Sequence, residues 1–243
     1  MDYEENAKVG LLKDFFIAGY ENITSLIISN LEWLLLNSIV IALQLIYIFF
    51  SLPWYLWVVM TFLGIVCVSY PATFALTRYI ADLVEYKVPP YLVFFKYFFK
   101  FWNKGIKFAI VAVLCISIIL ANICFYFMLG VKSKLFMLKF SFYLIASVWL
   151  WVLGIVSVSH IHLFPMVALR NDFDIWKILK DSVLLTLAFP LRSFLIFFLS
   201  CVLSLVWVFS GVGVLFFIVS APILLMVIFF RRYYCDLQHN NIL

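Results

Sequence analysis

The sequence predicts an all-α protein, a polytopic bundle of about six transmembrane helices, and two observations lead to this prediction. First, 67% of the 243 residues are hydrophobic and only 12% are charged, whereas soluble domains have roughly 45–50% apolar and about 25% charged residues. Second, several apolar runs reach the roughly 20 residues that a helix needs to cross about 30 Å of hydrocarbon. A soluble fold of this size has too little interior to bury so many apolar side chains.

Charged and turn-forming residues divide the chain into a cytoplasmic N-terminal segment (1–25), a single transmembrane domain (26–230) and a cytoplasmic tail (231–243). The apolar stretch 194–230 would form one helix of about 55 Å, so the sequence Ser-Gly-Val-Gly at 210–213 is expected to divide it into two spans. The six predicted spans cover residues 26–50, 54–77, 108–129, 140–165, 194–210 and 214–230.

The distribution of basic residues predicts the orientation of the chain. With both termini in the cytoplasm, 14 of the 17 Lys and Arg residues lie inside, and only Lys132, Lys134 and Lys139 lie outside. Cytoplasmic loops carry such an excess of Lys and Arg. The sequence therefore predicts a multi-pass protein of the cytoplasmic membrane. An acidic N-terminus followed by a long apolar run also argues against a cleaved signal peptide.

Two charged stretches between spans have the pattern of amphipathic helices that lie in the inner membrane interface. In the first stretch, aromatic residues alternate with a basic stripe at spacings of three and four, made of Lys96, Lys100, Lys104 and Lys107. In the second stretch, residues 174–181 place acidic and basic side chains on one face and apolar side chains on the other. The four lysines are candidate contacts for a partner protein or for lipid headgroups.

A weak internal repeat accompanies these amphipathic stretches. The second span ends with the segment from Pro71 to Arg78, and the fourth ends with the segment from Pro165 to Arg170. Each end is followed by an amphipathic stretch and a returning span. Two halves of the same orientation would form a parallel repeat, an arrangement that occurs in transporters. Pro and Arg also mark helix ends where there is no repeat, so both interpretations stay open.

Glu32 is the most unusual single residue, because it lies about two turns into the first predicted span. A carboxylate in hydrocarbon is costly, so Glu32 is expected to face the bundle and to find a polar partner there. The candidate intramembrane polar cluster consists of Glu32, Asn30, His160, His162, Arg78 and Arg170. Such a cluster would be either a proton-sensitive or substrate-binding site, or a set of polar contacts that hold helices together.

Sequence motifs of several functional classes are missing. The chain has no nucleotide-binding GxxxxGK[ST], no metalloprotease HExxH and no GxSxG nucleophile elbow. His160 and His162 point about 200° apart on a helix, and no CxxC pair occurs, so no metal or cofactor is expected. Basic residues flank apolar runs and form no nucleic-acid surface, so no nucleic-acid partner is expected.

Because these catalytic motifs are missing, a non-enzymatic protein is expected. A membrane-embedded enzyme would need an acid–base pair beside a nucleophile.

Several short segments resemble the YesL-like family of bacterial integral membrane proteins. The resemblance covers most of residues 26–200 and lies in Asn30-Leu31-Glu32-Trp33-Leu34-Leu35, Pro71-Ala72-x-x-Ala75-Leu76, Phe94-Phe95 with Phe98-Phe99, Pro165-Met166-Val167-Ala168-Leu169 and Leu179-Lys180-Asp181-Ser182-Val183-Leu184-Leu185. Tyr70 stands where the family usually has Gly before the first Pro. The family has no established activity, but its members are often encoded beside carbohydrate ABC transporters. The resemblance therefore implies a role near carbohydrate uptake.

Two functional expectations follow from the resemblance and from the missing motifs. The first is a membrane accessory or interaction protein whose partners are the lipid bilayer and the subunits of a carbohydrate ABC transporter. The alternative is a small transporter, or a substrate-binding membrane subunit, for a sugar or a related solute. The parallel repeat and the intramembrane carboxylate of Glu32 favour the alternative.

Overall fold

The computed structural model describes residues 2–50, 53–85, 89–90, 92–170, 174–211 and 217–239, which form helices joined by short connections and include no β-strand. The helices are α1 (Asp2–Glu21), α2 (Ile23–Phe50), α3 (Trp54–Gly64), the π-helical turn η1 (Ile65–Ser69), α4 (Tyr70–Val84), α5 (Val93–Lys132), α6 (Phe136–Leu169), α7 (Ile175–Ala188), α8 (Pro190–Phe209) and α10 (Ser220–His239). The chain is thus an all-helical membrane bundle, as the sequence predicts.

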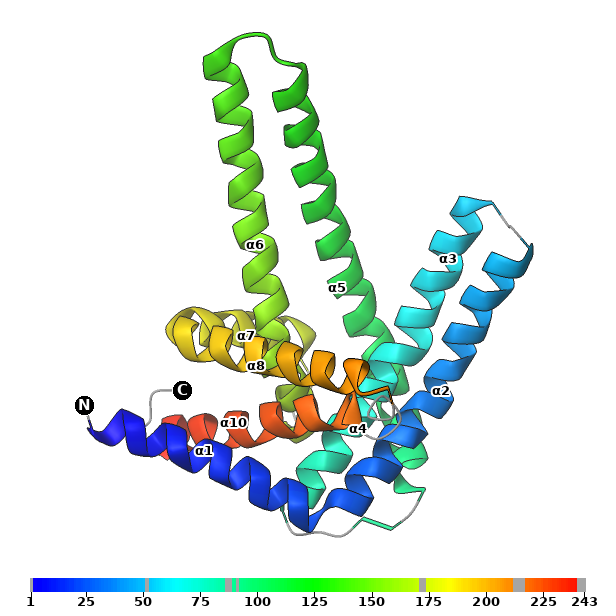
Figure 1. Cartoon of the computed structure of the whole chain (residues 1–243), viewed down its shortest axis with the longest axis vertical. Coiled ribbons are helices and arrows are strands. Elements are labelled where there is room, and N and C mark those ends of the chain that lie inside the picture. The colour runs from blue at the N-terminus through cyan, green and yellow to red at the C-terminus, as the bar shows by residue number, and fades with distance from the viewer. Residues whose placement is uncertain are drawn as a thin grey trace.

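Two helical hairpins project from a packed base (Figure 1). One hairpin is α2 with α3, and the other is the upper part of α5 with the upper part of α6. The base consists of α1, α4, α7, α8 and α10, together with residues 93–112 of α5 and 158–169 of α6; we call it the platform. In Figure 1, α1, α8 and α10 lie across the direction of the two hairpins.

The hairpins expose apolar side chains along most of their length, which is the pattern of helices surrounded by lipid. In α2, Phe49 is 81% exposed. Within the most apolar 18-residue stretch of this helix, only 6% of the residues are buried inside the protein. In the described part of the chain, five helices are long and apolar enough to cross a membrane: Ile23–Phe50, Trp54–Val84, Val93–Lys132, Phe136–Leu169 and Pro190–Phe209.

Helix α5 is much longer than a membrane crossing requires. Its 40 residues correspond to about 60 Å at 1.5 Å per residue, which is about twice the thickness of the hydrocarbon core. The first predicted amphipathic stretch is therefore the start of this continuous helix and not a separate element. Lys100 near the start of α5 and Lys132 at its end are separated by about 48 Å along the helix axis.

Helix α4 is the centre of the platform. Pro71 lies just after the π-helical turn η1, inside the continuous helix Trp54–Val84, and prolines and π-helical turns both interrupt the regular hydrogen bonding of a helix. Eleven of its 15 residues are buried, including Phe74, Leu76 and Ile80, which have no exposed surface. Aromatic and aliphatic residues of α5, α6 and α10 surround it, so α4 packs on all sides.

Polar contacts fix α2 against the helix that leads into α4. At the π-helical turn η1, Ser69 Oγ donates a hydrogen bond to Asn37 Oδ1 at 2.7 Å. Trp33 Nε1 donates to Thr73 Oγ1 at 3.2 Å, and Gln44 Nε2 donates to Thr61 Oγ1 at 3.0 Å. Side-chain hydrogen bonds of this kind commonly link membrane helices.

The last two predicted spans correspond to α8 and, in part, to α10. The prediction 194–210 corresponds to α8, which ends at Phe209, but α8 lies across the hairpins and packs on α10 (Figure 1). The prediction 214–230 begins outside the described residues, and the helix that follows, α10, starts at Ser220 and carries buried residues of the platform core. Helix α8 is long and apolar enough to cross a membrane, so 194–210 stays a predicted span.

The two predicted repeats share an order of elements but differ in detail. Helix α4 continues to Val84, whereas α6 ends at Leu169, four residues after Pro165. The first amphipathic stretch runs without a break into α5, but the second forms the separate helix α7, because Pro190 starts a new helix after Phe189. The N-terminal segment forms α1, which packs beside α10.

We predict that Gly105 is required for the close approach of α5 to α4. A Cβ atom at Gly105 would lie 2.8 Å from Pro71 Cα, whereas one at Gly154 would meet nothing within 4 Å. Gly105→Ala is therefore expected to lower the free energy of unfolding by about 1–3 kcal/mol. Gly154→Ala should leave it unchanged or raise it by up to about 1 kcal/mol. Melting temperatures in mild detergent measure the difference, and equal behaviour of the two variants would contradict the prediction.

Candidate functional site

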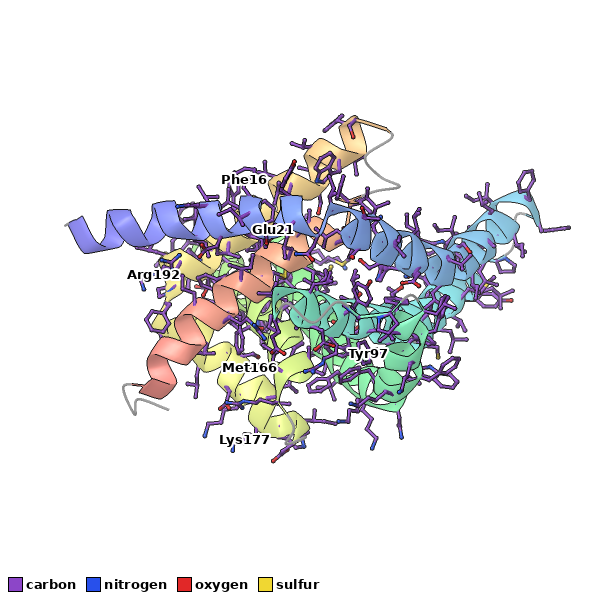
Figure 2. All side chains as sticks on the ribbon, turned by 90° about the horizontal axis from the view of Figure 1, so that it is seen from below. Phe16, Glu21, Tyr97, Met166, Lys177 and Arg192 are labelled. Carbon is purple, nitrogen blue, oxygen red and sulfur yellow. The ribbon has the colours of Figure 1, made fainter. Side chains whose placement is uncertain are left out.

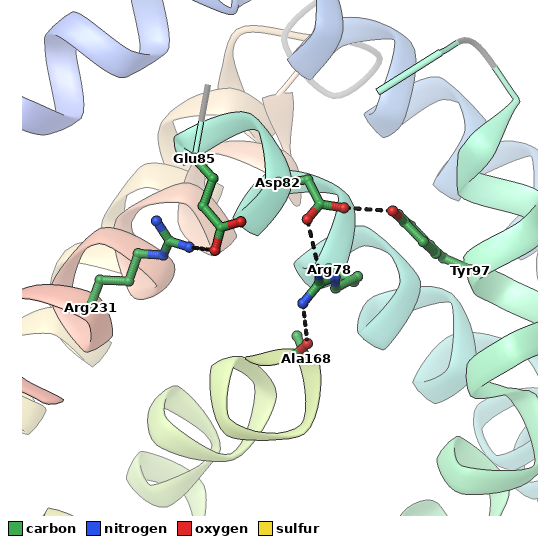
Figure 3. Close-up of polar contacts among 6 residues, drawn as sticks. All are labelled: Arg78, Asp82, Glu85, Tyr97, Ala168 and Arg231. Carbon is green, nitrogen blue, oxygen red and sulfur yellow. Dashed lines mark hydrogen bonds and ion pairs between the residues drawn. The ribbon is translucent and has the colours of Figure 1, made fainter. Parts of the chain in front are cut away.

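A partly buried polar network joins α4, α5 and α6 at the centre of the platform (Figure 3). Arg78 Nη2 lies 3.0 Å from Asp82 Oδ1, one turn further along α4. The same guanidinium donates through Nη1 to the carbonyl oxygen of Ala168 at the end of α6, at 3.0 Å. Tyr97 of α5 donates its hydroxyl proton to Asp82 Oδ2 at 2.6 Å. Because Asp82 is only 4% exposed, this pairing satisfies a charge that would otherwise be buried alone.

Other ion pairs connect neighbouring helices of the platform. Arg170, just after α6, contacts Asp181 of α7 at 2.6 Å. Arg231 of α10 contacts Glu85 at the end of α4 (Figure 3). Arg232 Nη1 lies 3.2 Å from Asp14 Oδ2 of α1. Three of the arginines on the predicted cytoplasmic side therefore hold the platform together.

Asn30 and Glu32 place polar groups at the starts of two helices. Asn30 Oδ1 accepts hydrogen bonds from the backbone N–H groups of Val219 and Ser220, at 3.1 and 3.3 Å, where α10 begins. The Glu32 carboxylate accepts a backbone hydrogen bond from Leu92, the residue before α5. Free N–H groups at helix starts favour such acceptors. The second Glu32 oxygen, Oε2, is buried and has no hydrogen-bond partner among the described residues.

The two histidines of α6 contact different helices, as their i, i+2 spacing predicts. His160 Nδ1 lies 2.8 Å from the carbonyl oxygen of Val156. Since a carbonyl only accepts, Nδ1 carries the proton, and in the neutral ring Nε2 accepts from the hydroxyl of Tyr70 at 2.9 Å. His162 Nε2 lies 2.9 Å from Ser193 Oγ of α8. Both His162 and Ser193 are buried, so this Ser–His contact links two helices and presents no accessible nucleophile.

The basic stripe of α5 lies opposite the buried face of that helix. Phe94, Phe98 and Phe101 point into the platform, whereas Lys96 and Lys100 are exposed. Lys107 is also exposed, and Lys104 is half-buried with its ammonium group 5.9 Å from the Phe101 ring centroid. The predicted position of these lysines on one outward face is thus observed. Two exposed aromatic residues, Phe99 and Trp102, lie beside the stripe.

A groove with a volume of about 450 Å³ lies between α1, α4 and α10. Its apolar lining includes Ile17 and Ala18 of α1 and Ile228 of α10, and its charged lining is Asp14, Glu21, Arg231 and Arg232. Figure 2 shows α1 beside α10, with Glu21 towards the place where the two helices converge. Sequence reasoning missed this groove, because its residues come from three segments that only folding brings together.

The six residues of the predicted intramembrane cluster have separate structural roles. Glu32 and Asn30 cap different helices, His160 and His162 contact α4 and α8, Arg78 belongs to the α4 network, and Arg170 pairs with α7. Sequence reasoning also missed Asp82 and Tyr97. The i, i+4 spacing of Arg78 and Asp82 is a signal that was present in the sequence. Among the residues that the structure describes, no group of three His, Cys, Asp or Glu side chains is arranged to hold a metal ion.

Comparison of the chain with protein-family models, with curated proteins and with solved structures gave no match.

We predict a graded loss of stability when the central network is removed in steps. Tyr97→Phe removes one hydrogen bond and should cost about 1 kcal/mol, whereas Asp82→Asn removes the charge that pairs with Arg78 and should cost about 2–3 kcal/mol. For a chain of this size, each kcal/mol lowers the melting temperature by roughly 2–4 °C. A melting curve of purified protein measures both variants. An Asp82→Asn protein as stable as wild type would show that the network does not stabilise the platform.

Proposed function

We propose that the protein is an accessory component of a carbohydrate uptake system in the bacterial cell membrane and acts by binding a cytoplasmic partner. Both termini and the platform face the cytoplasm, and the hairpin tips face outwards. The observation that carries the proposal is the basic stripe of α5, which is held on the outer face of a rigid helix. The resemblance to the YesL-like family supports the choice of partner, namely the ATPase or permease subunits of an ABC importer.

The charge distribution on α5 supports the docking role. Lys96, Lys100 and Lys107 lie on the outward face of the helix, whereas Arg78, Arg170 and Arg231 make ion pairs within the platform. An exposed positive surface steers association with an acidic surface and favours the correct orientation of the complex. The exposed aromatic rings beside the stripe provide the apolar contact area that interfaces commonly use.

The alternative function, transport of a sugar or related solute, has less support. A transport site in the membrane would need polar side chains that converge on one place. The candidate residues instead make contacts at separate places in the platform. Most side chains of the hairpins are apolar, and many of these are exposed, which suits contact with lipid better than the lining of a polar path.

We predict that the triple variant Lys96→Gln, Lys100→Gln, Lys107→Gln loses its importer subunits when the tagged protein is purified from native membranes in mild detergent. Exposed charge pairs contribute about 0.2–1 kcal/mol each, so three losses should reduce the recovered subunits roughly tenfold. Quantitative mass spectrometry of the purified sample measures the recovery. Raising the salt concentration should weaken the wild-type complex in the same direction.

The matched control removes the same number of charges at the hairpin tip: Lys132→Gln, Lys134→Gln, Lys139→Gln. This variant should recover the same subunits as wild type, because the tip lies about 48 Å from the base of α5. Equal losses from both variants would mean that general charge, and not the stripe, holds the partner. Absence of importer subunits from the wild-type sample would refute the accessory role.

A further inference from the structure

The α2–α3 hairpin joins the platform through a turn that interrupts the regular hydrogen bonds of the helix. In an α-helix, the carbonyl oxygen of Cys67 would accept from the N–H group of residue 71, four positions later. Pro71 has no N–H group, and the π-helical turn η1 lies just before it. Trp102 Nε1 of α5 instead donates a hydrogen bond to the Cys67 carbonyl oxygen at 3.0 Å. A side chain of a neighbouring helix therefore replaces the missing helix bond, as is common around prolines in membrane helices.

Helix α2 has a second weak point at the same level of the hairpin. Ser69 Oγ donates to Asn37 Oδ1, so the middle of α2 lies beside η1. One residue further along α2, Ser38 Oγ donates back to the carbonyl oxygen of Leu35 at 2.7 Å. Serine side chains that bond to the preceding turn compete with the helix and often bend it. Both helices of the hairpin can thus bend at one level.

Between this level and its tip, the hairpin has little support from the rest of the protein. Among the described helices, α3 packs chiefly on α2 and η1, and Figure 1 shows the two hairpins diverging from the platform. The 11 residues of α3 and the 5 of η1 form a lever of about 24 Å. A change of about 20° in the kink would therefore move the tip by about 8 Å.

We propose that η1 and Pro71 form a hinge on which the α2–α3 hairpin tilts towards and away from the α5–α6 hairpin, and that Trp102 is the latch that holds the observed tilt. The indole ring of Trp102 stacks on the buried Phe98, which fixes its position on α5. An unbonded carbonyl in an apolar environment is costly, so the hydrogen bond to Cys67 favours one kink angle over others. Trp102 is 44% exposed, so the latch lies at the surface of α5 and can be displaced from outside.

The test measures the distance between the hairpin tips by double electron–electron resonance on the spin-labelled full chain in mild detergent. The labels are attached at Phe50→Cys and Met137→Cys, both at exposed positions. Replacing the native cysteines keeps the latch, because the acceptor at position 67 is a backbone oxygen. Trp102→Phe removes the donor but keeps an aromatic ring, and it should broaden or shift the tip-to-tip distance distribution by about 8 Å. Trp151→Phe, the matched change at an exposed tryptophan of α6, should leave the distribution unchanged.

Two further measurements separate a hinge from general loosening of the fold. A second label pair, Met137→Cys with Trp176→Cys on α7, does not span the hinge and should keep its distance distribution in every variant. Pro71→Ala introduces an N–H group four positions after Cys67, so combining it with Trp102→Phe should restore the wild-type tip-to-tip distribution. An unchanged tip-to-tip distance in Trp102→Phe would overturn the proposal. So would broadening of both label pairs, or a double variant as broad as Trp102→Phe alone. No importer subunit takes part, so these outcomes are independent of the docking role.

Discussion

The rest of the structure depends on the burial of α4, which carries two charged residues into the middle of the platform. Burying an unpaired charge costs several kcal/mol, so Arg78 and Asp82 must find partners wherever α4 packs. They do so on both neighbouring helices: Tyr97 of α5 donates to Asp82, and the carbonyl oxygen of Ala168 at the end of α6 accepts from Arg78. One ion pair on α4 therefore specifies how the bases of α5 and α6 are arranged around it.

This constraint explains why the protein divides into a packed platform and two hairpins that contact little protein. The buried residues concentrate around α4, where aromatic side chains of α5 and α6 meet α10. Beyond that level, α5 and α6 pack mainly on each other, and α2 packs with α3. The hairpins contain few polar contacts between their helices, such as the hydrogen bond from Gln44 to Thr61. The basic stripe and the charged groove both lie in the platform.

Sequence reasoning predicted the helical membrane fold, because composition and apolar runs respond directly to the solvent around the helices. It also placed the basic stripe correctly, since periodicity within one helix determines which residues share a face. It did not predict that α8 lies across the hairpins, because the composition of one helix does not determine its direction relative to the others. Of the two interpretations of the residues around Glu32, their contacts agree with polar links between helices, but the individual partners could not be predicted. The hydrogen-bond partner of each polar side chain is set by contacts between segments far apart in sequence, such as α2 and α10.

The most direct test of the division into platform and hairpins is the position of Ser210. Ser204 Oγ donates to the carbonyl oxygen of Ile218, and Asn30 caps the start of α10, so the end of α8 lies near the base of α2. After replacement of the native cysteines, and in the proposed orientation with both termini in the cytoplasm, Ser210→Cys should resist a membrane-impermeant maleimide applied to intact cells, as Lys100→Cys should, whereas Lys134→Cys at the hairpin tip should react. Labelling of Ser210→Cys from outside, equal to that of Lys134→Cys, would show that α8 crosses the membrane and would contradict the platform.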